Sequence, residues 1–411
     1  MLRNGQIVML LTAALLAFGV VMVNSAALDL GGQTSLTDLL ASRQSGLAVA
    51  AFICLLAGSL IPVERLAPTP GRRSAAPWLL AVVVVALLAV YVPGLGREVN
   101  GARRWLQLGP IGLQPSEIAK WMVPVVVAWY CCDRAARMRE FTIGFALPCG
   151  VVGGICGMIA LHDLGTAVLI MVVAIAMLVA GGARILYPML IAPVLLAAAA
   201  LLIVVSPYRV NRILAYLDPY ADSQGIGYHV VQSMAAISGG GLAGRGLGNS
   251  IQKFGYLPEA TTDFIYAIVS EELGLVGALA VGALYAVLLL TGWAILRTAR
   301  TRPDGSRQLL LPAFGQLLGF GILLTIGVQA VMNIFVVTGL APTKGIALPL
   351  ISHGGTGWLL TGCSLGFLVG MERRALKAHA IHAPEALATA PEPHPPVAES
   401  GDQGGTPALS G

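Results

Sequence analysis

Charge is what this sequence has least of: Asp, Glu, Lys and Arg make up 11% of its 411 residues, whereas hydrophobic residues make up 56%. An ordinary soluble domain carries about 25% charged residues, so this composition argues against a soluble protein. Cysteines are also few, and none forms a spaced set in a loop: Cys54, Cys131, Cys132, Cys149, Cys156 and Cys363. Neither a disulfide framework nor a zinc site is indicated.

Two further signatures are missing. The glycine-rich stretch "GGGLAGRGLGNS" at 239–250 lacks the Gly-Lys-Ser/Thr of a nucleotide P-loop, so we interpret it as a set of flexible turns. No internal repeat is visible, so an inverted-repeat transporter is not favoured. The net charge of +5 is scattered between apolar runs. It therefore indicates orientation and contact with anionic lipid, not nucleic acid.

What the sequence does have is runs of about 20 apolar residues, long enough to cross roughly 30 Å of hydrocarbon as helices. The first run resembles a signal peptide, but because many spans follow it we expect an uncleaved helix. The predicted fold class is all-α, a polytopic membrane protein with about ten transmembrane helices. We place them at 6–27, 44–61, 77–93, 116–132, 141–159, 164–181, 185–206, 263–296, 309–337 and 351–371.

Basic residues gather in the loops on one side of this predicted bundle, for example around Arg137 and Arg300. By the positive-inside rule, this side and both termini are cytoplasmic. The predicted transmembrane domain is 1–374, with a large extracytoplasmic loop at 207–262 between helices 7 and 8. The tail at 375–411 is rich in Pro, Ala and Gly, which predicts a disordered cytoplasmic segment.

Four acids stand together in "GYLPEATTDFIYAIVSEELGLVG", residues 255–277, beside a charge-free run. A helix over 263–296 puts Glu271 and Glu272 at the outer boundary of the hydrocarbon. Asp263 then lies roughly 12 Å above Glu271, on the same side of the helix, with Glu272 pointing the opposite way. An acid at headgroup depth can act on the polar end of a lipid. Alternatively, Asp263 caps the helix while the two glutamates keep its boundary soluble.

The outer segment "GREVNGARRWLQLGPIGLQPSEIAK", residues 96–120, also carries charge. Arg104 and Trp105 come first, and Glu117 and Lys120 follow at a spacing that puts them on one helix face, where they can pair. Arginine and lysine at the outer interface suit a phosphate or diphosphate. Taken alone, they serve equally well as bilayer anchors, with Trp105 as an interfacial residue.

A third outer segment, "GLAPTKGIALPLISHGGTGW" at 339–358, places prolines and glycines around Lys344. These residues resist a regular helix, and we expect the segment to fold back into a cavity. In "LHDLGTAVLI", Asp163 stands at the start of another span, where its expected role is that of a helix cap.

Together, these segments resemble the SEDS family of bacterial cell-wall proteins, which includes FtsW, RodA and SpoVE. The resemblance covers about residues 60–374. Its blocks are "NGARRWLQLGPIGLQPSEIAK", "DLGTA", "LDPYADSQGIGYHVVQS", "GYLPEATTDFIYAIVSEELGLVG" and "GLAPTKGIALPLISHGGTG". The "PTKG" around Lys344 is most similar to the division and sporulation branch, and so to FtsW-like members. His162, His229, His353, Thr356 and Gly357 depart from the residues usual in the family.

The resemblance implies an inverting peptidoglycan glycosyltransferase that polymerises lipid II at the outer face of the bacterial cytoplasmic (inner) membrane and expels undecaprenyl diphosphate. It also implies a class B penicillin-binding protein (a transpeptidase) and divisome proteins as partners, at the division septum. The family's essential acid falls on Asp263. Its other motif residues fall on Arg104, Trp105, Gln114, Pro115, Glu117 and Lys120.

A mechanism follows as a hypothesis. Asp263 is the base for the acceptor hydroxyl, and Arg104, Lys120 and Lys344 bind the departing diphosphate. A divalent cation, Mg or Mn, is a candidate cofactor. Three alternatives stay open: an elongation-type (RodA-like) polymerase, a lipid II flippase or other lipid transporter, and a non-catalytic scaffold for a transpeptidase.

Overall fold

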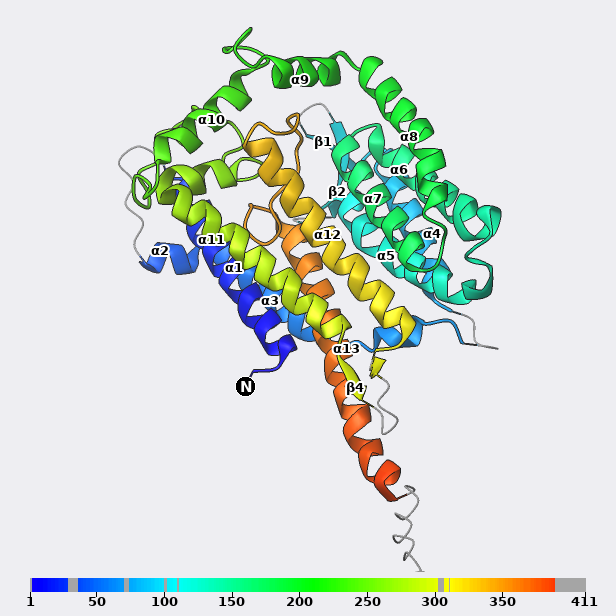
Figure 1. The fold of residues 1–411 in the computed structure, drawn as a ribbon. Helices are drawn as coiled ribbons and strands as arrows, with labels where there is room; N and C mark the ends of the chain where they lie inside the picture. The colour runs from blue at the N-terminus through cyan, green and yellow to red at the C-terminus, as the bar shows by residue number, and fades with distance from the viewer. Residues whose placement is uncertain are drawn as a thin grey trace, which may run out of the picture.

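The computed structural model describes residues 2–28, 36–69, 74–99, 102–108, 111–301, 307–309 and 311–388. Over these residues the chain forms a bundle of long helices (Figure 1). The long helices are α1 (Asn4–Ala26), α3 (Arg43–Leu60), α4 (Ala76–Ala89), α5 (Pro115–Asp133), α6 (Leu147–Ala160), α7 (Leu164–Ala180), α8 (Leu186–Val204), α11 (Ile265–Leu296), α12 (Ala313–Val337) and α13 (Gly355–Ala388).

Shorter elements connect these helices. The short helices are α2 (Leu36–Ala41), η1 (Val63–Leu66), η2 (Ala135–Arg137), η3 (Thr142–Ala146), α9 (Pro207–Leu217) and α10 (Tyr228–Gly240). The strands are β1 (Gly96–Val99), β2 (Ala102–Leu108), β3 (Ile111–Leu113), β4 (Ala299–Thr301) and β5 (Arg307–Leu309). Strands β1, β2 and β3 form one antiparallel sheet in that order, and β4 and β5 form another. Neither sheet was predicted from the sequence.

Each of the ten predicted spans overlaps one long helix, so the prediction of a polytopic helical membrane protein is confirmed. Among the described residues, six helical units are long and apolar enough to cross a bilayer: α1, α3, η3 with α6, α8, α11 and α12. Helices α4 and α7 are apolar but shorter. The count of ten crossings stays a prediction.

The closest helix contact in the bundle depends on glycines of α13, which packs along α3. Gly362, Gly366 and Gly370 recur every four residues and so form one stripe on α13. A Cβ at any of them would overlap a backbone carbonyl oxygen of α3, at Ala51, Leu55 or Ser59. Small residues at this spacing let two membrane helices approach backbone to backbone, where packing drives association in the absence of water.

Helix α11 is broken near its outer end. Gly274 has φ 67° and ψ −165°, which interrupts the helix and which residues with a Cβ rarely adopt. The loop that follows α10 satisfies the backbone at the break. The N–H groups of Arg245 and Gly246 donate to the carbonyls of Glu271 and Glu272, at 3.0 and 2.9 Å. The glycine-rich stretch therefore forms turns, as predicted, and its backbone completes the broken helix, whereas its flexibility stays a prediction.

The start of α1 and the end of α13 lie at one end of the bundle, and α9 and α10 lie at the other (Figure 1). Near the chain ends, Glu372 of α13 accepts from the backbone N–H of Gly5 at 2.7 Å, and Arg374 bonds Glu64 at 3.0 Å. Helix α13 extends to Ala388, past residue 375 where the predicted tail begins, and the disorder of that tail stays a prediction. The rest of the predicted tail lies outside the described residues.

Candidate functional site

A cavity of about 360 Å³ lies beside α9 and α10. Its lining comes from segments far apart in the sequence: the large loop, the turn before α11 and the segment after α12. The charged residues that line it are two cations and three acids, Arg212, Lys344, Asp222, Glu259 and Asp263. This cavity brings together two of the residues predicted from the sequence, Asp263 and Lys344.

Backbone contacts hold Asp263 at this cavity. Asn333 of α12 is buried and donates from Nδ2 to the carbonyl of Asp263 at 2.8 Å and to the carbonyl of Ile346 at 2.7 Å. One amide therefore fixes the turn before α11 against the segment after α12. Gly345 of that segment faces the acid, because a Cβ there would lie 3.1 Å from Asp263 Oδ2. Any larger residue at 345 would press on the carboxylate.

The Asp263 carboxyl is half-buried, and it makes no hydrogen bond or ion pair with any residue that the structure describes. Helix α11 begins after it, with Phe264 at the N-cap and no side-chain cap. The alternative that Asp263 caps the helix is therefore wrong, and so is its placement on one helical face with Glu271. Burial, followed by the negative charge of Glu259, raises the pKa of Asp263 to about 7, against a lowering by Arg212. Such a carboxyl is suited to proton transfer at neutral pH.

Two cations line the cavity with Asp263. Lys344 is half-buried, and burial lowers its pKa. Arg212 of α9 donates from Nη1 to the carbonyl of Thr343 at 3.0 Å and from Nη2 to the hydroxyl of Tyr208, and its guanidinium lies 4.5 Å from the Tyr208 ring centre. Arg212 is thus bonded to the peptide unit that joins Thr343 to Lys344. The prediction that this segment lines a cavity is confirmed, whereas the ligand of Lys344 stays a prediction.

Arg104 and Trp105 lie on β2 and do not line the larger cavity. Arg104 lines a smaller cavity of about 30 Å³ with His162 and Asp163, and its Nε is buried without a partner among the described residues. Asp163 caps α7 as predicted, since its side chain accepts from the backbone N–H of Thr166 at 3.0 Å. The positive charge of Arg104 lowers the pKa of Asp263, so a residue of the smaller cavity acts electrostatically on the acid of the larger one.

Glu117 and Lys120 pair as predicted, with 2.7 Å between Oε2 and Nζ, but neither lines the larger cavity. Lys120 is buried and also donates to Oε1 of Gln329 at 2.8 Å, and Gln329 donates to the carbonyl of Ala347 at 2.7 Å. The pair therefore supports the segment that carries Lys344. Gln114 is the N-cap residue of α5, without a side-chain cap bond. Roles of these three residues in substrate binding stay predictions.

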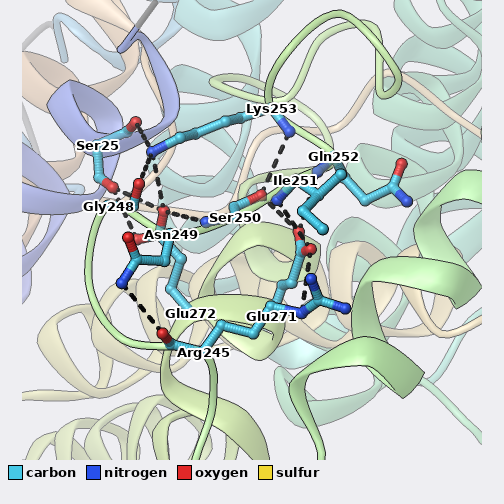
Figure 2. A network of polar contacts seen from close by, with 10 residues as sticks. All are labelled: Ser25, Arg245, Gly248, Asn249, Ser250, Ile251, Gln252, Lys253, Glu271 and Glu272. Atoms are coloured by element: carbon cyan, nitrogen blue, oxygen red, sulfur yellow. Dashed lines mark hydrogen bonds and ion pairs between the residues drawn. The ribbon is translucent and has the colours of Figure 1, made fainter. Parts of the chain in front are cut away.

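Glu271 and Glu272 are both buried in protein, so their predicted role in keeping the helix boundary soluble is wrong, whereas their depth at the hydrocarbon boundary stays a prediction. Figure 2 shows their network. Glu272 accepts from the hydroxyl of Ser25 of α1, at 2.7 Å, and lies 3.3 Å from Nζ of Lys253. Glu271 accepts from the hydroxyl of Ser250. These acids hold the large loop and α1 together at the break in α11, a contact that depth counting on a single unbroken helix does not reveal.

Sequence reasoning also missed Arg212 and Asn333. Asn333 had a signal: it is an amide in the apolar run of α12, as Gln329 is, and such residues commonly form hydrogen bonds between helices. Arg212 belongs to a short amphipathic helix, whose pattern predicts a surface position but not which cavity the guanidinium enters.

The sequence matches the family model described as "Cell cycle protein", FtsW/RodA/SpoVE, over residues 6–377. The "Probable peptidoglycan glycosyltransferase FtsW" of Geobacter metallireducens is 37% identical over 374 residues, 90% of this chain and 95% of its own length. The protein of the same name from Nitrosococcus halophilus is 42% identical over 302 residues, 72% of this chain and 74% of its own length.

Two solved structures share the fold. One, from work on "Structural coordination of polymerization and crosslinking by a peptidoglycan synthase complex", has a TM-score of 0.69 and 28% identity, over 90% of this chain and 97% of its own. The other, the rod shape determining protein RodA of Thermus thermophilus, has a TM-score of 0.58 and 24% identity, over 90% and 96%. With the family model matching most of its length, the chain belongs to the FtsW/RodA/SpoVE family of cell cycle proteins.

Proposed function

We propose that this protein is a peptidoglycan glycosyltransferase that polymerises lipid II at the outer face of the cytoplasmic membrane. The observation that carries the proposal is the content of one cavity. It holds a half-buried carboxyl, Asp263, with a pKa of about 7, and two cations, Arg212 and Lys344. The relatives named peptidoglycan glycosyltransferase support the class of reaction.

In the proposed reaction, the 4-hydroxyl of an acceptor sugar attacks the anomeric carbon of a lipid-linked glycan chain. A new C–O bond forms as the bond to the diphosphate breaks, and the carboxylate of Asp263 takes the hydroxyl proton. A positioned base of this kind typically contributes about 10²- to 10⁴-fold in rate. Undecaprenyl diphosphate leaves as an anion and needs no proton, so a second catalytic carboxyl is not required. Attack opposite the leaving group converts an α-linked donor into a β-linked product.

The departing diphosphate gains negative charge, which positive groups in a partly dehydrated site stabilise. Of the three cations predicted for this role, Lys344 lines the cavity with Asp263, which supports its assignment. Arg104 is in the adjoining cavity. Lys120 is neutralised by Glu117 at 2.7 Å, which favours a supporting role for it.

A divalent cation, Mg or Mn, remains a candidate cofactor, and we tested the residues for a place to hold it. Among the described residues, no three His, Cys, Asp or Glu side chains come together as a metal-binding group. The described residues therefore provide no such group of ligands, and no step of the proposed reaction is assigned to a cation.

The proposed partner is a class B penicillin-binding protein, because the solved relative with 28% identity belongs to a peptidoglycan synthase complex that coordinates polymerization and crosslinking. A septal location with other divisome proteins is proposed from relatives that carry the name FtsW. The positive-inside distribution supports cytoplasmic termini and a cavity on the outer side.

The test is an in vitro polymerisation assay with purified protein, its transpeptidase partner and lipid II. We expect the wild-type protein to make glycan polymer and Asp263→Asn, which keeps the shape but not the basicity, to lose at least about 100-fold in rate. Wild-type polymer yield from Asp263→Asn would remove Asp263 as the base.

The same assay separates the alternatives. A lipid II flippase or a scaffold forms no polymer when lipid II is already accessible, so polymer from the purified complex excludes both as the main activity. An elongation-type role is tested in cells, where a fluorescent fusion at the septum supports the division role and a fusion along the side wall contradicts it.

A further inference from the structure

The charges that line the larger cavity divide into two groups. The first group is already satisfied within the chain. Asp222 accepts from the backbone N–H groups of Gly225 and Ile226 at 2.9 and 3.1 Å, and Glu259 accepts from the hydroxyl of Thr262 at 2.7 Å. Both acids therefore already accept hydrogen bonds that stabilise the loops that carry them.

The second group, Arg212 and Lys344, forms no ion pair with a described residue, although Asp263 acts electrostatically on Arg212 and Asp163 on Lys344. Within the described residues, neither Arg212 nor Lys344 has a carboxylate within ion-pair distance, although both are half-buried in a cavity with three acids in its lining. Two partly buried cations beside one peptide unit, neither of them ion-paired with a described residue, form a place where an anion can bind.

The contacts of Arg212 orient it for such an anion. Two of its five N–H donors are used, one on the carbonyl of Thr343 and one on the hydroxyl of Tyr208, and its Cζ lies 4.5 Å from the Tyr208 ring centre. The other three donors have no partner among the described residues, and the fork of a guanidinium matches the geometry of phosphate oxygens. Because the bonded carbonyl belongs to the residue before Lys344, the two cations stand at adjacent positions of the wall.

We propose that Arg212 is a substrate-binding residue that clamps the diphosphate of the lipid-linked substrate together with Lys344. This inference rests on the proposed function and adds a residue to it. Arg212 supplies the two-pronged contact and Lys344 the point charge, with Asp263 on the same cavity for the sugar hydroxyl. The anionic group recognised is a phosphate ester, which either an isoprenyl diphosphate or a phospholipid headgroup can supply.

The experiment compares Arg212→Gln with Arg209→Gln in the full-length protein with its partner. Arg209 lies on the same helix but donates to the carbonyls of Leu202, Ala160 and Leu161 and does not line the cavity. We expect Arg212→Gln to raise KM for lipid II about tenfold or more, the loss typical of a charge-assisted hydrogen bond, with a smaller change in kcat. Arg212→Lys should recover part of the loss, and Lys344→Gln should reproduce it.

Equilibrium binding in detergent supplies a readout other than activity. Radiolabelled undecaprenyl diphosphate should bind the wild-type protein and Arg209→Gln about equally and Arg212→Gln about tenfold more weakly, with each variant first shown to be folded by its melting curve. Unlabelled undecaprenyl diphosphate should displace the label far better than phosphatidylglycerol. Equal displacement by phosphatidylglycerol would assign the site to a headgroup and overturn the proposal.

Two other results distinguish failure here from failure of the proposed function. If the wild-type protein makes polymer while folded Arg212→Gln keeps its KM and its binding, or if Arg209→Gln loses as much, Arg212 is not a diphosphate ligand. If the wild-type protein makes no polymer but binds undecaprenyl diphosphate through Arg212, the binding site stands and the polymerase function fails.

Discussion

At the scale of single residues, the protonation of Asp263 is the property most open to test. Its pKa lies at about 7 because burial and the charge of Glu259 disfavour the carboxylate. A base must be deprotonated, so kcat/KM should rise with pH, level off above 7, and fall to about a tenth of the plateau one pH unit below the pKa. Glu259→Gln removes a negative charge and should move the midpoint to lower pH, whereas Arg212→Gln should move it to higher pH. The measurement is a pH profile of polymerisation for all three proteins, and a profile that stays flat from pH 5 to 8 contradicts Asp263 as the base.

The residues of the site were predictable to different extents. Asp263 and Lys344 were predicted because charged residues are rare in an apolar sequence and therefore indicate a function, and because their motifs resemble those of a known family. Arg212 and Asn333 were missed because their roles depend on which distant segments meet. Lys120 was assigned to the substrate, but its spacing from Glu117 was the more informative feature, since it predicted the pair that is found.

At the scale of elements, long apolar runs predict helices well, because a helix satisfies its own backbone and needs no distant partner. Prediction from apolar runs fails where the backbone forms hydrogen bonds with a segment that is distant in the sequence. The sheet of β1, β2 and β3 was missed because its strands are short and because β1 pairs with β2 through a register shift between Arg97 and Glu98. The break at Gly274 was missed because glycine is tolerated inside helices. A glycine in the sequence indicates a break only when the loop that bonds to the broken backbone is also known.

The break at Gly274 leads to a prediction with a control on the same helix. Gly274→Ala forces a Cβ onto a left-handed backbone and into the loop at Leu242 and Gly244, so we expect a loss of at least about 1–3 kcal/mol of stability. Gly282→Ala meets nothing within 4 Å and should be neutral or slightly stabilising. Thermal unfolding of both purified variants in detergent tests this. Equal melting temperatures for the two would mean that the loop does not depend on the break.

At the scale of the whole molecule, the arrangement of the two ends makes a prediction about sides of the membrane. The start of α1 and the end of α13, with contacts such as that of Glu372 with Gly5, lie opposite α9 and α10, whose residues line the cavity (Figure 1). If loops rich in arginine stay in the cytoplasm, the cavity must open outside, where lipid II is polymerised in the proposed function. Gln224 is exposed in the large loop, and Ala135 is exposed between α5 and α6, on the predicted cytoplasmic side.

Single cysteines at these two positions decide the orientation. In spheroplasts, a membrane-impermeant maleimide should label Gln224→Cys at once and Ala135→Cys only after the membrane is permeabilised. The six native cysteines are buried or half-buried, so the wild-type protein supplies the background. The reverse labelling pattern would place the cavity in the cytoplasm. An enzyme with its base and diphosphate site on that side could not extend glycan outside the membrane, so that result would contradict the proposed function as a whole, not one residue of it.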